Sequence, residues 1–272
     1  EYVYDTEIQK KVNGVEVDGT WIQQGAKEVI NMNNSEEKAD VKLAVDRMEE
    51  TFKNLEWVSV ICTWFADSLD ASAAKIEPRV EYKTSTRVQP DNWQVGNYTR
   101  SNTQRVTVDS NNRPIYGGTP SDSSILNLLD ELQSRNYKVM FYPMIFVDTP
   151  TKPWRGKMTA DAAEISNFFS KSKGYNEFIN HYADLVKNKV DAFIIGTEMK
   201  GLTAVQDSSD DSFPAVDEFI SLASAVKSTL PASVKVSYAA DWSEYHSVDG
   251  WYNLDKLWAS DDIDFIGIDA YF

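Results

Sequence analysis

The chain has 272 residues, enough to bury a large apolar core, and it carries 42 Asp and Glu against 27 Lys and Arg. The resulting net charge of −15, with no run of basic residues, argues against a nucleic-acid partner, because phosphate contacts need basic patches. No apolar run reaches the length of a membrane span, and no signal peptide opens the chain.

The first predicted elements are a helix over residues 39–55 and a strand over residues 57–64. Apolar residues recur through the helix at three- and four-residue steps. The strand, WVSVICTW, is a nearly continuous apolar run, as expected of a strand that is buried on both faces. Cys62, the only cysteine, lies inside this strand, so it forms no intrachain disulfide, and its apolar setting argues against a nucleophilic role.

Residues 67–120 depart from this pattern and are rich in Thr, Asn, Arg and Gln, with several turn signals. Short alternating pieces at 79–82 and 104–108 predict small strands or a hairpin. Loops of this length are uncommon unless they are functional. We therefore interpret the segment as an insertion that decorates the active face of the domain.

Strands and helices alternate through the rest of the chain. Helices are predicted at 124–132, 168–186 and 216–230, the first with Ser121 or Asp122 as its N-cap, and strands at 138–146, 191–195, 234–240 and 263–268. The strands end close to an acidic residue, at Asp67, Asp148, Glu198, Asp241 and Asp269. Alternation with acids collected at one edge predicts an α/β fold of the (β/α)8 TIM-barrel type, as a single domain over 1–272. A doubly wound open sheet is the competing architecture, but no strand is followed by a glycine-rich phosphate loop.

Glu198 is the most distinctive of these acids, because it is the lone carboxylate at the end of the run DAFIIGTE. Ligands of α/β sheets bind at the carboxyl ends of the strands, so this position favours a catalytic role. The alternative is that Glu198 caps the following turn or pairs with Lys200.

The aromatic content is high, with eight Trp and thirteen Tyr, several of them next to the strand-end acids. A site that stacks sugar rings requires such neighbours, although any single aromatic residue can equally fill the core. The two histidines, His181 in a helix and His246 in a loop, make a zinc site improbable, and no Ser/His/Asp arrangement is visible. We expect neither a metal nor a cofactor.

Seven sequence blocks together resemble the TIM-barrel domain of gene transfer agent and phage tail hub proteins. They are EYVYDTE at 1–7, WFADSL at 64–69, YGGTPSD at 116–122, PWRG at 153–156, IIGTEMKGLT at 194–203, VSYAADWSEY at 236–245 and DFIGIDAY at 264–271. That domain is in turn similar to clan A glycoside hydrolases of the bacterial β-mannanase type.

The resemblance implies six strands, from EYVYDT at 1–6 to the strand that ends at Phe272, and places Glu198 at the acid/base position of strand four. Thr197 stands where many of these enzymes carry Asn. The family's nucleophile lies on strand seven, so we expect the chain to be a fragment, truncated after strand six, with the nucleophile beyond Phe272. The candidate substrate-binding residues are Trp64, Tyr142, Trp154, Arg155, Tyr238, Asp241, Trp242, Asp269 and Tyr271. A salt bridge to a nearby acid is the alternative role for Arg155.

Two hypotheses follow. In the first, the protein is a glycoside hydrolase that acts on a cell-envelope polysaccharide or peptidoglycan-type glycan, with Glu198 as acid/base. In the second, the barrel is a non-catalytic structural or glycan-binding module of a phage-tail-like hub, with other tail or hub proteins as partners. The sequence assigns no compartment by itself, and the resemblance implies a particle component made in the bacterial cytoplasm.

Overall fold

A computed structural model describes residues 4–8, 10–12, 27–83, 88–89 and 92–270. The chain divides into two compact units, one formed by Glu1–Val58 with Pro78–Val139 and the other by Ser59–Glu77 with Met140–Phe272. A single domain with an insertion at 67–120 therefore stays a prediction.

The first unit contains two helices, α1 (Asp40–Thr51) and α2 (Asp122–Ser134), which contact each other. Both confirm predicted helices. The N-cap of α2 is Ser121, whose hydroxyl accepts a hydrogen bond from the Ser124 backbone N–H at 3.2 Å. This side-chain cap satisfies one of the N–H groups that the first turn of a helix leaves without a partner.

Small strands make up the rest of this unit. β1 (Lys10–Val12) pairs antiparallel with β2 (Lys27–Val29) and β6 (Val88–Gln89), and β7 (Gln94–Val95) pairs antiparallel with β8 (Tyr98–Thr99). The short strands predicted near 79 and 104 are present as β5 (Arg79–Val80) and β9 (Gln104–Arg105). They pair in parallel, so they do not form a hairpin with each other.

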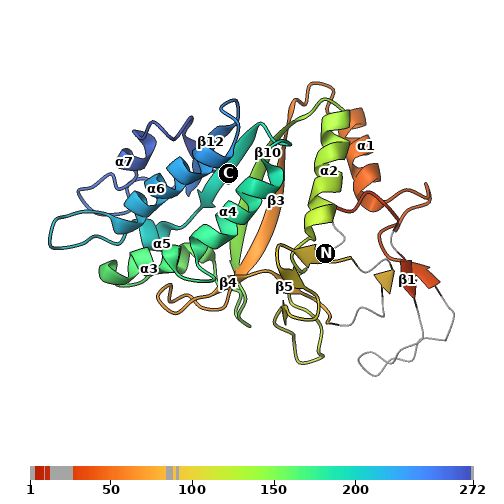
Figure 1. The fold of residues 1–272 in the computed structure, drawn as a ribbon, viewed down its shortest axis with the longest axis horizontal. Coiled ribbons are helices and arrows are strands. Elements are labelled where there is room, and N and C mark those ends of the chain that lie inside the picture. Colours follow the sequence, from red (N-terminus) through yellow and green to blue (C-terminus); the bar gives the residue numbers. More distant parts are fainter. Residues whose placement is uncertain (1–3, 9, 13–26, 84–87, 90–91, 271–272) are drawn as a thin grey trace. The chain divides into compact units, whose positions relative to one another are not determined.

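The second unit holds a six-stranded sheet of order β13-β12-β11-β10-β3-β4 (Figure 1). Its strands are β3 (Trp57–Ala66), β4 (Ile76–Glu77), β10 (Lys138–Val147), β11 (Ala192–Thr197), β12 (Lys235–Asp241) and β13 (Gly267–Asp269). Neighbours from β10 to β13 pair in parallel, whereas β4 pairs antiparallel with β3. The Lys138 N–H donates to the Glu56 carbonyl and the Asp148 N–H to the Ala66 carbonyl, both at 2.8 Å, so β3 and β10 also run in the same direction.

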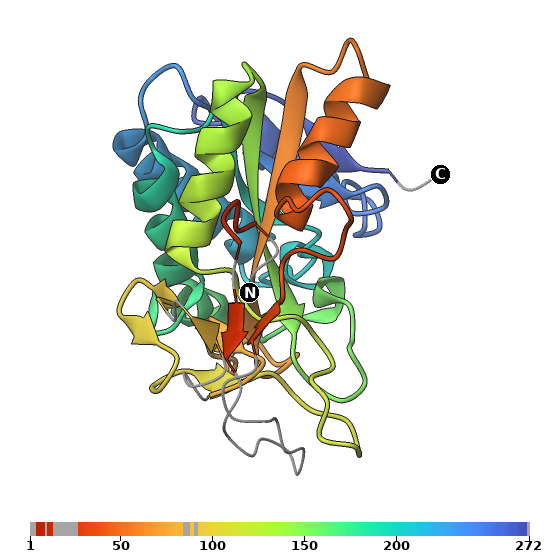
Figure 2. The ribbon, with the colours of Figure 1, turned by 90° about the vertical axis from the view of Figure 1, so that its right-hand side faces the viewer.

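Helices cover one face of this sheet, as Figures 1 and 2 show for α4 (Tyr175–Val186) and α6 (Pro214–Thr229). Both contact each other and α3 (Ile165–Ser170), and α6 contacts β11 and β12. Residues 168–186, predicted as one helix, form the end of α3 and all of α4, because Lys173 adopts a positive φ of 60° between them. Short helices complete the unit: η2 (Arg155–Lys157), η3 (Ala162–Glu164), α5 (Lys200–Thr203) and α7 (Asp255–Trp258).

Alternation along the strands separates the two faces of the sheet. Phe141 and Phe193 stack with ring centroids 6.0 Å apart, and Phe141 also meets Tyr182 of α4, so this set faces the helices. Tyr142 and Ile194, one residue further along each strand, belong to a separate buried cluster with Met144 and Ala239. This second set lies on the face where a barrel has its interior.

Two predicted strands differ from the structure. Tyr4–Thr6 lie outside any strand, because the Asp5 carboxylate accepts the Glu7 N–H at 3.1 Å in a local turn, and residues 1–3 lie outside the described residues. The strand expected over 263–268 is limited to Gly267–Asp269. Before it, the Asp264 carboxylate accepts the Val236 N–H at 2.7 Å, so a side chain occupies a donor that a strand ladder would use.

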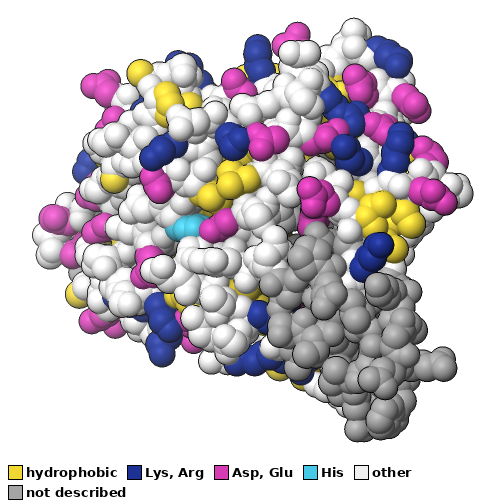
Figure 3. All heavy atoms as spheres, turned by 45° about the vertical axis from the view of Figure 1, so that its right-hand side comes forward, with side chains coloured by type: hydrophobic (Ala, Val, Ile, Leu, Met, Phe, Trp, Pro, Cys, Tyr) yellow, Lys and Arg dark blue, Asp and Glu magenta, His cyan; other side chains and the backbone are white. Residues whose placement is uncertain are grey.

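Among the described residues, no helix is long and apolar enough to cross a membrane. On the face that Figure 3 shows, the coloured Lys and Arg side chains are interspersed with Asp and Glu. Charges mixed in this way do not form the continuous basic surface that binds phosphate backbones.

Candidate active site

The end of β11 places Glu198 in a strained position. All six residues of the strand are buried, and the chain then turns so that Glu198 adopts a left-handed φ of 50°. For a residue with a side chain this conformation costs about 1–2 kcal/mol. Two hydrogen bonds of 2.8 Å hold it, from the Glu198 N–H to the Ala239 carbonyl and from the Met199 N–H to the Tyr238 hydroxyl.

Glu198 is 3% exposed, and its side chain pairs with the PWRG segment. Its Oε2 atom accepts a hydrogen bond from Trp154 Nε1 at 2.6 Å and forms an ion pair with Arg155 Nη2 at 2.9 Å. Arg155 also donates to the Thr197 carbonyl at 2.9 Å and to the Thr197 hydroxyl at 3.0 Å. The salt bridge considered for Arg155 is therefore present, and its partner is Glu198. Lys200, the alternative partner of Glu198, donates to the Ser243 hydroxyl.

Two glycines allow the segments to approach this closely. A Cβ atom on Gly156 would lie 2.4 Å from the Trp154 ring, and one on Gly201 would lie 2.4 Å from the Met158 carbonyl oxygen. Such distances are far inside van der Waals contact. A side chain at Gly201 would therefore push α5 away from η2, and one at Gly156 would displace the Trp154 ring that bonds to Glu198. The glycines of PWRG and GTEMKGLT thus serve the contact between these two blocks.

Asp269 joins the same group from β13. Thr197 Oγ1 donates to Asp269 Oδ2 at 3.1 Å, and the Tyr142 hydroxyl hydrogen-bonds to both Thr197 and Asp269. Burial raises the pKa of the Asp269 carboxyl, and the nearby Glu198 charge adds to this, whereas the hydrogen bonds from Tyr142 and Thr197 oppose it. Burial and the Asp269 carboxylate together raise the pKa of the Tyr142 phenol.

A third carboxylate, which the sequence analysis did not single out, lies in the loop just after β12. Glu244 is fully buried and accepts hydrogen bonds from the Tyr238 hydroxyl and the Thr203 hydroxyl, both at 2.7 Å, and from the Asp241 N–H at 3.0 Å. Burial raises the pKa of the Glu244 carboxyl to about 7. Because Tyr238 also accepts the Met199 N–H, Glu244 supports the turn that carries Glu198.

The other predicted site residues differ in burial and in whether they join the group around Glu198. Asp241 is buried, pairs in register with Asp269, and accepts the Ser243 N–H at 3.0 Å. Trp242 is among the most exposed aromatic residues, whereas Trp64 is buried and donates to the Tyr182 hydroxyl of α4 at 2.8 Å. Tyr238 is also buried, and Tyr271 lies outside the described residues. The structure therefore brings together Glu198, Trp154, Arg155, Tyr142 and Asp269, and it does not bring Trp64 to them.

No group of three or more His, Cys, Asp or Glu side chains among the described residues could hold a metal ion. The donors around Glu198 are an indole, a guanidinium and hydroxyls. Hydrogen-bond donors and a cation at these positions can hold a carboxylate in a fixed orientation.

A parallel sheet with helices on one face and a carboxylate at the end of a central strand defines an α/β domain of the TIM-barrel type. Residues 173–272, which include Glu198 and Asp269, match the family model of the GTA TIM-barrel-like domain, in agreement with the resemblance found in the sequence. No curated protein matches the chain.

Similar solved structures include a GH113 β-1,4-mannanase, with 17% identity and a TM-score of 0.45 over 79% of this chain and 53% of that one. A GH113 β-mannanase from Alicyclobacillus acidocaldarius, in complex with ManMIm, has 14% identity and a TM-score of 0.48 over the same shares of the two chains. The chain thus spans about half the length of these structures.

Proposed function

We propose that this domain is a glycoside hydrolase-like barrel that acts on a cell-envelope polysaccharide, with Glu198 as the general acid and base. The observation that carries the proposal is the strained backbone of Glu198 at the carboxyl end of β11. Backbone strain of this kind gathers at functional sites, where the surrounding structure holds it in place. Trp154, half-exposed beside Glu198, offers a ring on which a sugar can stack.

The chemistry of a retaining glycosidase needs two carboxyl groups. One protonates the leaving oxygen while the other, roughly 5 Å away, attacks the anomeric carbon, and the first then activates the water that releases the sugar. In this proposal Glu198 performs the proton transfers, and the nucleophile is supplied by sequence outside the 272 residues. Asp241 and Asp269 are the substitutes within the chain, and Asp269 is coupled to Glu198 through Thr197 and Arg155.

A second function is favoured by the burial of Glu198. A carboxylate that is 3% exposed and engaged by both Trp154 and Arg155 must leave these partners, at least in part, to reach a glycosidic oxygen. A non-catalytic glycan-binding or structural module of a phage-tail-like hub has no such requirement. The two functions differ in turnover of the glycan.

The deciding experiment is Glu198→Gln in a version of the protein extended by roughly one hundred residues, enough for two further βα units. Hydrolysis of bacterial envelope glycans is expected to fall by about a hundredfold or more, the contribution of a positioned proton donor. Because the variant leaves a buried Arg155 without its charge partner, a loss of stability of about 3 kcal/mol is also expected. Rates are therefore measured well below the unfolding temperature of the variant.

The 272-residue chain alone serves as the comparison, and we expect it to show no measurable hydrolysis. If the chain cleaves these glycans and Asp269→Asn abolishes the cleavage, Asp269 is the second carboxylate. If the extended protein binds glycans without cleaving them, the module without turnover is the correct function.

A further inference from the structure

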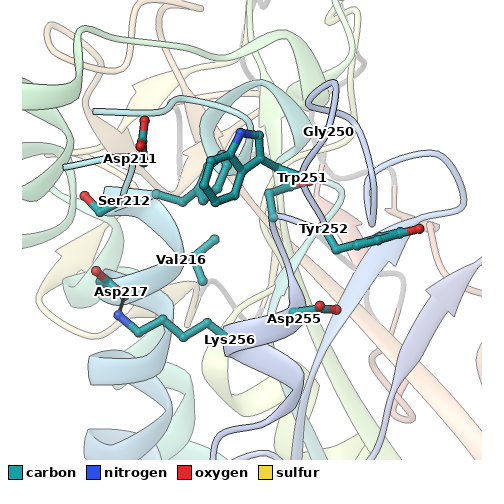
Figure 4. A pocket seen from close by; sticks show the side chains of 11 residues that line it. Asp211, Ser212, Val216, Asp217, Gly250, Trp251, Tyr252, Asp255 and Lys256 are labelled. Carbon is teal, nitrogen blue, oxygen red and sulfur yellow. Dashed lines mark hydrogen bonds and ion pairs between the residues drawn. The ribbon is translucent and has the colours of Figure 1, made fainter. Parts of the chain in front are cut away.

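A hollow of about 390 Å³ lies in the second unit, outside the group around Glu198 (Figure 4). Residues 211–217, at the start of α6, form one side, and residues 250–256, in the loop that follows β12 and the start of α7, form the other. Its volume is within the range of small-molecule binding sites. The loop segments follow the carboxyl ends of β11 and β12, so the hollow belongs to the sheet edge that carries Glu198.

Aromatic rings form one side of the hollow and remain open to solvent. Trp251 is 43% exposed and Tyr252 is 58% exposed. Each is held by another ring, since Trp251 meets Phe213 edge-on with centroids 6.0 Å apart and Tyr252 lies 5.3 Å from Tyr245. Because these rings are already held in place, they lose little conformational entropy when a ligand binds to them. Their exposed apolar faces suit the C–H face of a sugar.

Carboxylates occupy the rest of the rim. Figure 4 shows Asp217 across the hollow from Trp251, Asp211 to the left of Trp251, and Asp255 below Tyr252. Lys256 is the only cation among the lining residues, all of them described, and it forms an ion pair with Asp217. Asp211 and Asp255 therefore leave an excess of negative charge, and Asp255 also accepts a hydrogen bond from the Tyr245 hydroxyl. Carboxylate oxygens accept hydrogen bonds from hydroxyl groups and repel anionic ligands.

We propose that this hollow is a subsite for a neutral hexose unit of a glycan chain, with Trp251 as the stacking platform and Asp211 and Asp255 as hydroxyl acceptors. This subsite proposal rests on the proposed function, and it specifies the class of glycan on which the domain would act. The ligand is a chain of uncharged, hydroxyl-rich sugars, and uronic acid chains are rejected by the carboxylates. A chain seated here lies on the same edge of the sheet as Glu198.

Calorimetric titration of the whole chain with cellohexaose, mannohexaose and chitohexaose tests the proposal, with hexagalacturonate as the anionic comparison. At least one neutral hexasaccharide is expected to bind, and Trp251→Ala to weaken its affinity about tenfold, the loss of one stacking contact. Trp251→Tyr, which keeps a ring, should retain most of the affinity. Trp57→Ala is the matched control, because Trp57 is 44% exposed at the start of β3 and lines no part of the hollow.

A second pair of variants tests the role of charge. Asp211→Asn combined with Asp255→Asn should let hexagalacturonate bind more tightly than it binds the unaltered chain. Equal affinities of Trp251→Ala and Trp57→Ala for a neutral hexasaccharide would overturn the subsite and leave the proposed function intact. The proposed function has its own readout, because Glu198→Gln in the extended protein is expected to leave binding at the hollow unchanged while hydrolysis falls.

Discussion

At the scale of single residues, the candidate active site depends on the buried ion pair between Arg155 and Glu198. The Arg155 guanidinium satisfies both the Glu198 carboxylate and two oxygens of Thr197, so one cation fixes the side chain and the backbone of the same turn. A buried pair of this kind costs a great deal to break, because the remaining charge has no solvent to replace its partner. Specific geometry around Glu198 is therefore built into the fold before any ligand arrives.

Glu244 makes stability depend on pH. Its pKa is raised from the ordinary 4.5 to about 7 by burial, so between these values the folded protein keeps a proton that the unfolded chain has lost. The stabilisation is complete below about pH 4.5 and disappears as the pH rises to about 7, a change of roughly 3 kcal/mol in the free energy of unfolding. Urea unfolding of the wild type and Glu244→Gln, measured from pH 4.5 to 8, checks this prediction.

The expected result is that Glu244→Gln loses less stability than the wild type over that range. Glu50→Gln, which removes an exposed carboxyl on α1, is the control and should keep the wild-type pH dependence. Parallel curves for the wild type and Glu244→Gln would contradict the prediction. The absolute stability of the variant is a poorer measure, because Gln offers one acceptor oxygen where Glu244 uses two for three donors, so part of this hydrogen-bond network must reverse its donors and acceptors.

At the scale of elements, the contact between α5 and η2 positions Glu198, which precedes α5, against Trp154 and Arg155 at the start of η2. Helix propensity alone predicts that Gly201→Ala stabilises α5 by about 1 kcal/mol. The close approach of α5 to the backbone of Met158 predicts destabilisation instead. The new Cβ would lie 2.4 Å from the Met158 carbonyl oxygen, which belongs to the backbone and cannot rotate away. We expect Gly201→Ala to lower the free energy of unfolding by about 1–3 kcal/mol.

Chemical unfolding followed by tryptophan fluorescence measures this change, and it also reports on Trp154 beside the helix. Gly117→Ala is the control, since the nearest atom to its Cβ would be 3.9 Å away, an ordinary contact. If both alanine variants are as stable as the wild type, η2 can move away from α5 without cost, and the site is less rigid than its contacts indicate.

Elements were predicted better than the contacts between them. The runs at 57–64, 138–146 and 234–240 appear as β3, β10 and β12, since apolar content and length decide a buried strand locally. The position of Glu198 at a strand end was predicted in the same way, and its catalytic role stays a prediction. Its ion pair with Arg155 was not, because 43 positions separate the two residues and only the folded chain brings them together.

Glu244 was missed for a related reason. A glutamate in a loop next to aromatic residues has the sequence pattern of an exposed acid, and its burial depends on hydrogen bonds from Tyr238 and Thr203. The partial signal was its place in the block VSYAADWSEY, three residues after the strand-end Asp241.

Trp64 shows the reverse. The apolar run 57–64 predicts a strand buried on both faces, so it does not decide which face a given side chain occupies. That prediction is wrong for most of β3, because Trp57 and Ile61 are exposed on one face whereas Val60, Cys62 and Trp64 are buried on the other.

At the scale of the whole molecule, net charge sets how salt acts on stability. With 42 acidic and 27 basic residues, repulsion among carboxylates opposes the folded state at neutral pH. Salt screens this repulsion over roughly 10 Å at 0.1 M. We therefore expect the unfolding temperature at pH 7.5 to rise by a few degrees between 10 and about 300 mM NaCl, a change of about 1 kcal/mol.

The same titration at about pH 4.5 is the control, because the carboxylates are then partly protonated and the net charge is small. The rise in unfolding temperature should shrink there, since little repulsion remains to be screened. Surface ion pairs such as Lys38–Asp46 are also weakened by salt and act in the opposite direction. An unfolding temperature that falls with NaCl at pH 7.5 would show that these pairs outweigh the excess of acid, and scanning calorimetry at both pH values separates the two results.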